Sequence, residues 1–202
     1  MPNAEMPLLK QADFVDGSLA GWSFTDANAF AIAATPKGKA LSVEKASKYQ
    51  PPVRSPLAIA WWDAAGAVGD FALTVQCKST VKHNSAHRDL CLFFGKQAAD
   101  KFYYVHFARA ADPAAHSIFL VDGKPRVSIA KERNHGIEWH DAWHTLRLVR
   151  TVADGAIAAY FDDLDHPIMK AVDKTFVSGP VGVGTFDDLG WFREIELRGR
   201  RP

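Results

Sequence analysis

Hydrophobic and polar residues alternate along most of the chain. The alternation has a period of two, which places the apolar side chains of each segment on one side of an extended backbone. This pattern is typical of half-buried β-strands. It occurs at residues 71–78, 118–121, 127–130, 146–149, 157–162 and 194–198.

Two more strands are expected at residues 88–95 and 101–107, on either side of a polar turn. In the second of these, Phe102, Tyr104 and His106 share one face, and the residues between them are aromatic or apolar as well. A strand that is apolar on both faces is typical of the centre of a sheet that is covered on both sides.

Turn signals separate the strands. Asp122-Gly123 and Asp154-Gly155 each predict a hairpin, because glycine adopts positive φ at little cost. Helical periodicity is scarce, with a turn or two expected within residues 56–67, and residues 35–48 are read as a loop with an edge strand. Without a break in composition or an internal repeat, residues 1–202 are expected to form one sandwich or barrel domain.

Several segments resemble the concanavalin A-like lectin and glucanase superfamily, in particular laminin G-like and 3-keto-disaccharide hydrolase-like domains. The resemblance lies in residues 13–22, 93–95, 102–105, 143–150, 157–163, 179–186 and 191–197. It implies an all-β, concanavalin A-like jelly-roll sandwich of two antiparallel sheets, with any glycan site on a concave sheet. The same fold hosts enzymes, lectins and adhesion modules, so activity does not follow from it.

Composition excludes several classes of partner. The chain has 202 residues, of which 48% are hydrophobic, and a formal net charge of +1. This balance does not favour nucleic acid or an anionic membrane. No apolar run reaches the roughly 18 residues of a membrane span. The first residues lack the features of a signal peptide. We expect a periplasmic or secreted protein if such a peptide was removed, and a cytoplasmic one otherwise; the sequence leaves the oligomeric state open.

The acidic residues argue against one catalytic mechanism of the superfamily. Family 16 glycoside hydrolases carry Glu-x-Asp-x-x-Glu on a central strand, and the nearest match is Glu194-Ile-Glu196. The middle acid differs and the third is absent. Since Ile195 and Leu197 are expected in the core, both glutamates are predicted to lie on the solvated outer face. A hydrolase or lyase of another type stays open.

Other polar residues are candidates for a glycan groove. His106 and His116 flank the loop at 108–115 and are the candidate acid and base, since imidazole titrates near neutral pH. Lys78 and Arg88 are expected to bind hydroxyl or carboxylate groups, although Arg88 has Asp89 or Asp70 as alternative partners. Each histidine can also be a structural residue.

The aromatic residues supply rings on which a sugar can stack. Tyr104 and Trp139 are the aromatic members of the expected ligand-binding set. Trp61 and Trp62 also lie in loop-like segments, whereas Trp22, Trp143 and Trp191 match structural positions of the resembled domains and are expected in the core.

No metal site is expected from the histidines, because no pair of them has the spacing of a zinc protease and no cluster of cysteine and histidine occurs. A structural calcium ion is a further candidate, since domains of the resembled kind often hold one through carboxylates. Asp162-Asp163 and Asp187-Asp188 are the candidate ligands, with solvated or capping aspartates as the alternative. Cys77 and Cys91 are read as buried free thiols or as a cross-strand disulfide.

These features favour a carbohydrate-binding or carbohydrate-active domain. The alternative is a non-catalytic module that binds protein partners, and this alternative predicts an exposed apolar patch in place of a polar groove. The positions of His106 and Arg88 discriminate the two. One shared, solvent-filled cleft favours ligand binding, and burial in separate ion pairs counts against it.

Overall fold

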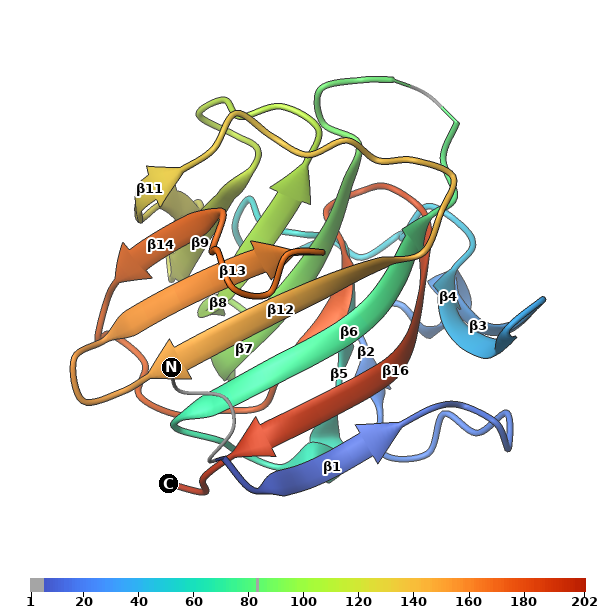
Figure 1. Ribbon diagram of the computed structural model, residues 1–202, viewed down its shortest axis with the longest axis horizontal. Coiled ribbons are helices and arrows are strands. Elements are labelled where there is room, and N and C mark those ends of the chain that lie inside the picture. Colours follow the sequence, from blue (N-terminus) through green and yellow to red (C-terminus); the bar gives the residue numbers. More distant parts are fainter. Residues whose placement is uncertain (1–5, 83) are drawn as a thin grey trace.

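The computed structural model describes residues 6–82 and 84–202, and two antiparallel β-sheets account for its architecture. Figure 1 looks onto one sheet, with β12, β6 and β16 in front and strands of the second sheet behind them. This is the all-β jelly-roll sandwich expected from the alternating pattern. No helix in the described part of the chain has the length and apolar character needed to cross a membrane.

The first sheet has nine strands among the described residues. Its order along the sheet is β11 (Ala130–Arg133), β14 (Met169–Val172), β13 (Ala156–Phe161), β12 (His144–Thr151), β6 (Phe71–Ser79), β16 (Gly190–Gly199), β4 (Gly38–Val43) and β3 (Phe30–Thr35), and β1 (Leu8–Ala12) also pairs with β16.

The second sheet has seven described strands, and two short 3-10 turns lie in its connections. Its order is β10 (Val127–Ser128), β9 (Ser117–Asp122), β8 (Lys101–Ala108), β7 (Asp89–Ala98), β15 (Gly182–Thr185), β5 (Ala58–Trp61) and β2 (Ser23–Phe24), and the turns are η1 (Ala27–Ala29) and η2 (Asp63–Ala65).

The main core lies between the two sheets. Leu73 of β6 and Leu148 of β12 face Leu92 of β7 and Val105 of β8 within one continuous apolar cluster. The expected hairpins at Asp122-Gly123 and Asp154-Gly155 are confirmed, since β9 pairs with β10 and β12 pairs with β13.

The seven-stranded sheet is also covered on its outer face. Residues 44–57, here called the strap, cross this face between β4 and β5. Val53 of the strap packs on an apolar cluster that includes Phe93 and Tyr104. The strap is fixed where the carbonyl of Arg54 accepts a hydrogen bond from the Arg126 amide, 3.1 Å away. The expectation that β8 is covered on both faces is therefore confirmed.

Of the turn or two of helix expected within residues 56–67, only the second half is confirmed. The first half of this segment forms β5, which is buried throughout and pairs with β15 and β2, and the second half retains only the 3-10 turn η2. Tertiary pairing overrides the weak local preference here. Gly184 permits the close approach of β15, because a Cβ at this position would collide with the carbonyl oxygen of Ala58.

Candidate functional site

The residues expected to line one groove lie in different parts of the molecule. Lys78 is on the outer face of the nine-stranded sheet, on β6. Tyr104 and His106 belong to β8 and face outward from the other sheet, beneath the strap. Arg88 and Trp139 are buried, at 4% and 5% exposed. These side chains do not share a cleft.

Arg88 connects β6 to the segment before β12 through hydrogen bonds. Its Nε donates a hydrogen bond to the Ser79 hydroxyl and its Nη1 to the Trp139 carbonyl, both at 3.0 Å. The acidic group beside it is Asp141, 3.8 Å away, and not Asp89 or Asp70. The Trp139 ring is also buried, edge-on against Phe161. Arg88 and His106 therefore lie in separate, buried sets of contacts, the outcome that counts against a shared ligand cleft.

His116 follows the loop that joins β8 to β9. The two strands form the expected hairpin, and His106 pairs with Ser117, the residue after His116. The His116 Nδ1 accepts a hydrogen bond from the Ala108 amide at 3.3 Å, so its Nε2 carries the proton toward Asn134 Oδ1, 2.5 Å away. Burial lowers the pKa of His116 to about 4. The imidazole is thus neutral and fully engaged by its neighbours.

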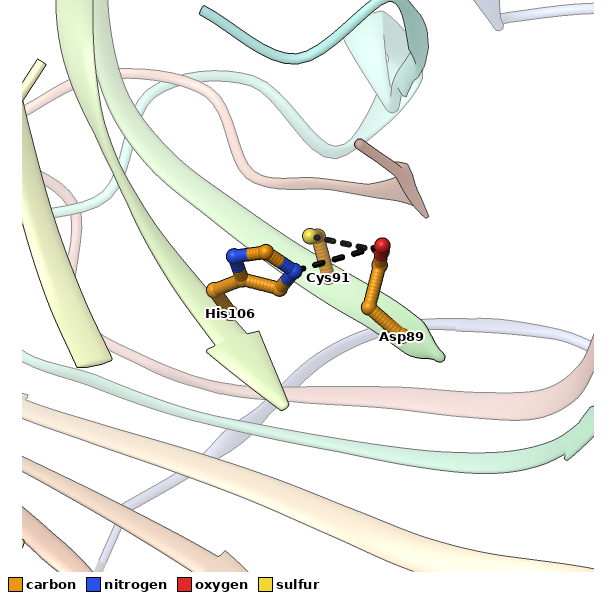
Figure 2. A group of neighbouring side chains, drawn as sticks. All are labelled: Asp89, Cys91 and His106. Carbon is orange, nitrogen blue, oxygen red and sulfur yellow. Dashed lines mark hydrogen bonds and ion pairs between the residues drawn. The ribbon is translucent and has the colours of Figure 1, made fainter. Parts of the chain in front are cut away.

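Three buried side chains form a polar cluster under the strap, and Figure 2 shows them together. Asp89 and Cys91 are two residues apart on β7 and point to the same side, and His106 pairs with Cys91 from β8. The His106 Nε2 lies 3.2 Å from Asp89 Oδ2, and the Cys91 Sγ lies 3.6 Å from Asp89 Oδ1. Burial and the neighbouring Asp89 raise the pKa of the Cys91 thiol.

Aromatic rings and a guanidinium group cover this cluster. The Phe186 ring stacks on His106 with centroids 5.9 Å apart, and Arg126 lies 3.9 Å above the Phe186 ring. Asp89 fixes the covering turn, because its Oδ1 accepts a hydrogen bond from the Phe186 amide at 2.9 Å. Desolvation and the charge of Asp89 raise the pKa of Asp187, the next residue of this turn.

Two hollows lie along β6 and β16 on the outer face of the nine-stranded sheet, with volumes of about 400 Å³ and about 270 Å³. They share no lining residue, and we call the two together the outer groove. Its wide end is lined by Gln11, Thr74, Gln76, Arg147, Glu194 and Glu196, and its narrow end by Lys78, Asp141 and Trp191.

Most of the tryptophans reverse the expectation drawn from sequence. Trp143 and Trp191, expected in the core, are partly exposed on the outer face. Trp22 is partly buried against the main core and stacks on Trp62, in agreement with its expected position. Trp61, Trp62 and Trp139, expected to be free, are at most 5% exposed. Alternation in β12 already indicated an outward Trp143, because Leu146 and Leu148 point inward and residue 143 has the opposite parity.

A β-bulge shapes the groove wall. The register between β16 and β6 shifts between Arg193 and Glu196, and Glu194 adopts a φ of 45°. Glu194 is exposed while Ile195 and Leu197 are buried, so the outer-face placement of the two glutamates is confirmed. Hydrogen bonding from Arg198 lowers the pKa of Glu196. Bulges often re-aim side chains beside binding sites.

The cysteines form no disulfide, and Asp162 makes hydrogen bonds within the fold. Cys77 and Cys91 are free thiols on opposite sheets, which excludes the disulfide between neighbouring strands. Asp162 bonds the His144 Nδ1 and the Thr145 amide, both at 2.8 Å. These contacts match the expectation that an aspartate of this kind caps backbone and side-chain groups. Calcium binding by Asp162-Asp163 or Asp187-Asp188 stays a prediction.

Comparisons with known proteins identify the fold. No family model matches the chain, and no curated protein does. Among solved structures, the carbohydrate-binding module CBM66 from Bacillus subtilis matches with a TM-score of 0.62 and 18% identity, over 89% of this chain and 96% of that one.

Two further solved structures match over nearly the whole chain. Domain 4 of AbnA, an arabinanase from Geobacillus stearothermophilus in complex with arabinotriose, gives a TM-score of 0.56 at 10% identity, over 96% of this chain and 93% of that domain. The GH43 protein BlXynB from Bacillus licheniformis gives 0.69 at 10% identity, over 99% of this chain but 41% of that protein. The sandwich is thus concanavalin A-like, as the sequence resemblance implied.

Proposed function

We propose that this protein is a carbohydrate-binding domain and that the outer groove holds the glycan. The observation that carries the proposal is the makeup of the groove, where hydrogen-bonding side chains project from adjacent strands beside two partly exposed tryptophans. Sugars present hydroxyl groups at their edges and apolar C–H groups on their faces, so a site of this kind satisfies both.

Arg147 is the cation best placed to bind sugar hydroxyl or carboxylate groups. Its Nε donates a hydrogen bond to the Thr74 hydroxyl at 3.0 Å, which fixes the guanidinium plane over the groove. No hydrogen bond from its two terminal nitrogens is found among the described residues. Lys78 adds a second cation at the narrow end, in keeping with its expected role in ligand binding. The groove also carries Glu194, Glu196 and Asp141, so its charge does not select between neutral and acidic glycans.

The fold comparisons support the same ligand class. The structures that match include a module named for carbohydrate binding, a domain in complex with arabinotriose, and a winged bean lectin in complex with methyl-α-D-galactose. The alternative of a protein-binding module receives less support. The exposed large hydrophobic residues are Leu8, Val15, Val127, Val172 and Val177, and none of them lines the outer groove.

Affinity electrophoresis in gels that contain neutral or uronic acid polysaccharides tests the proposal. Calorimetry with oligosaccharides of the retarding polymer then gives the affinity. We expect the wild type to bind, and Arg147→Ala or Trp191→Ala to weaken binding roughly tenfold, about 1.4 kcal/mol. Lys170→Ala is the matched control, because Lys170 is an exposed cation of the same sheet on β14, paired with Glu132.

Two results would contradict the proposal. One is the absence of binding to every polysaccharide and oligosaccharide tried. The other is binding that the two groove variants leave unchanged, which would place the glycan elsewhere on the molecule. A reducing-end assay on the same polymers tests whether binding leads to cleavage.

A further inference from the structure

The buried cluster under the strap has the geometry of a metal site. Asp89, Cys91 and His106 each offer one donor atom, and these atoms all lie within 4.8 Å of one another. The three residues are at most 2% exposed. As Figure 2 shows, the edge of the imidazole ring points at the carboxylate and the sulfur atom.

The hydrogen bonding of this cluster is incomplete. Among the described residues, neither His106 ring nitrogen has a hydrogen-bond partner, and neither does Asp89 Oδ2. The 3.2 Å contact between His106 Nε2 and Asp89 Oδ2 lacks hydrogen-bond geometry. A buried polar atom without a partner costs roughly 1–3 kcal/mol, so such atoms usually mark an ion, a water molecule or a ligand.

We propose that Asp89, Cys91 and His106 form a zinc site. A carboxylate oxygen, a thiolate sulfur and an imidazole nitrogen are all zinc ligands, and the combination suits zinc better than calcium or magnesium. Zinc–ligand bonds of about 2.0–2.3 Å place neighbouring donors about 3.3–3.8 Å apart in a tetrahedron. His106 Nε2 lies 3.2 Å from Asp89 Oδ2, and Cys91 Sγ lies 3.6 Å from the other carboxylate oxygen, Oδ1. All three donors lie within 4.8 Å of one another, so small side-chain shifts bring them to zinc-ligand spacing.

The surroundings carry charges of both signs, because the Arg126 guanidinium lies above the Phe186 ring that covers the cluster. Asp89 is held in place by the Phe186 amide at its Oδ1, in the manner of the outer-shell contacts that orient metal ligands. Asp187 is exposed and follows Phe186, but it is not among the three residues whose donor atoms lie within 4.8 Å of one another. Sequence reading missed this site because the three donors are spread over residues 89–106, and only the β7–β8 pairing brings His106 opposite Cys91.

Metal titration of the full chain tests the site directly. Protein that has been stripped with a chelator is titrated with Zn²⁺ by calorimetry, and with Co²⁺ while the near-ultraviolet absorption is recorded. We expect about one ion per chain, and a thiolate-to-cobalt charge-transfer band that reports a Co–S bond. The metal content of the purified wild type, measured by mass spectrometry, requires no variant.

Two cysteine variants separate the site from general thiol chemistry. Cys91→Ser is expected to lose the charge-transfer band and to bind Zn²⁺ at least tenfold more weakly. Cys77→Ser is the matched control, since Cys77 is an equally buried free thiol on the opposite sheet, and it should behave as the wild type does. His106→Gln provides a second ligand variant if Cys91→Ser does not fold.

The proposal is overturned if the stripped wild type binds neither ion. It is also overturned if Cys91→Ser and His106→Gln bind Zn²⁺ as tightly as the wild type. Glycan binding is assayed separately on stripped protein. The outer groove lies on the other sheet, so either proposal can fail alone.

Discussion

Trp143 and Trp191 lie beside each other on the outer face of the nine-stranded sheet, with ring centroids 6.2 Å apart and ring planes inclined by 33°. Trp143 precedes β12 and Trp191 belongs to β16, so the pair spans β6 between them. Both rings are partly exposed, and Trp191 lines the narrow end of the outer groove. This pair provides an apolar platform on an otherwise polar face.

A glycan in the outer groove should change the fluorescence of this pair. We expect an oligosaccharide that binds the wild type to shift or quench tryptophan emission, because ring exposure changes when a sugar stacks on it. The response should be lost in Trp191→Phe and retained in Trp61→Phe, since Trp61 is 4% exposed on the other sheet. An unchanged response in Trp191→Phe would move the contact away from the groove.

Arg193 should be a strong determinant of stability. Its guanidinium lies 4.2 Å from the Trp143 ring centroid, and it donates hydrogen bonds to Gln76 Oε1 and the Lys37 carbonyl at 2.6 Å and 2.8 Å. We expect Arg193→Ala to lower the free energy of unfolding by about 2–4 kcal/mol in urea titrations.

The control for Arg193 is Arg198 on the same strand. The Arg198 side chain is 38% exposed and pairs with Glu196, so Arg198→Ala should cost less than about 1 kcal/mol. Equal losses in the two variants would show that the buried contacts of Arg193 contribute no more than a surface ion pair.

Arg150 should be intolerant of substitution. It is 2% exposed and donates hydrogen bonds to the carbonyls of Gly155, Asp173 and Phe176 at 2.7–3.3 Å. Arg150→Met keeps much of the volume but leaves these carbonyls without their donor, and we expect a loss of about 3–5 kcal/mol. Thermal and urea unfolding measure the change. Arg147→Met, on the outer face of the same strand, should unfold almost as the wild type does.

His116 should contribute to the loss of stability in acid. The folded protein keeps His116 neutral down to its pKa of about 4, whereas in the unfolded chain it binds a proton below about 6.5. The unfolded state therefore holds more protons between pH 4 and 6.5, and stability falls as the pH falls through this window. The full effect is about 3 kcal/mol.

Comparison with a variant isolates this effect from that of the carboxyl groups. Urea unfolding of the wild type and of His116→Gln between pH 4 and 8 gives the difference in free energy. We expect this difference to change by about 3 kcal/mol between the ends of the range, with the wild type relatively more stable at pH 8. A difference that is constant with pH would mean that His116 titrates normally in the folded state.

The alternating pattern by itself determined the fold class, the two hairpins and most of the core. Burial on one side of a strand imposes a period of two, so residues such as Leu146 and Leu148 are visible from their spacing alone. The same argument placed Glu194 and Glu196 outside and showed that β8 is covered on both faces.

Only the tertiary structure decided the candidate sites. The bulge after Arg193 adds a residue to one strand, so it reverses which positions face the core: Phe192 points inward before it and Ile195 after it. Counting from Ile195 therefore puts Trp191 in the core, whereas it lies on the groove. A bulge exchanges the inward-facing and outward-facing positions of a strand, and the sequence carries no signal for it here.

The path of the strap was likewise decided only by the tertiary structure. Its path over Phe93 and Tyr104 depends on contacts with Arg126 and Phe186, which are far away in the sequence. The pattern of β8 predicted a cover on this face, but only the tertiary structure shows that Phe186 and Arg126 lie over His106. Local periodicity records whether a residue is buried, but the partner that buries it is fixed only when distant strands and loops come together.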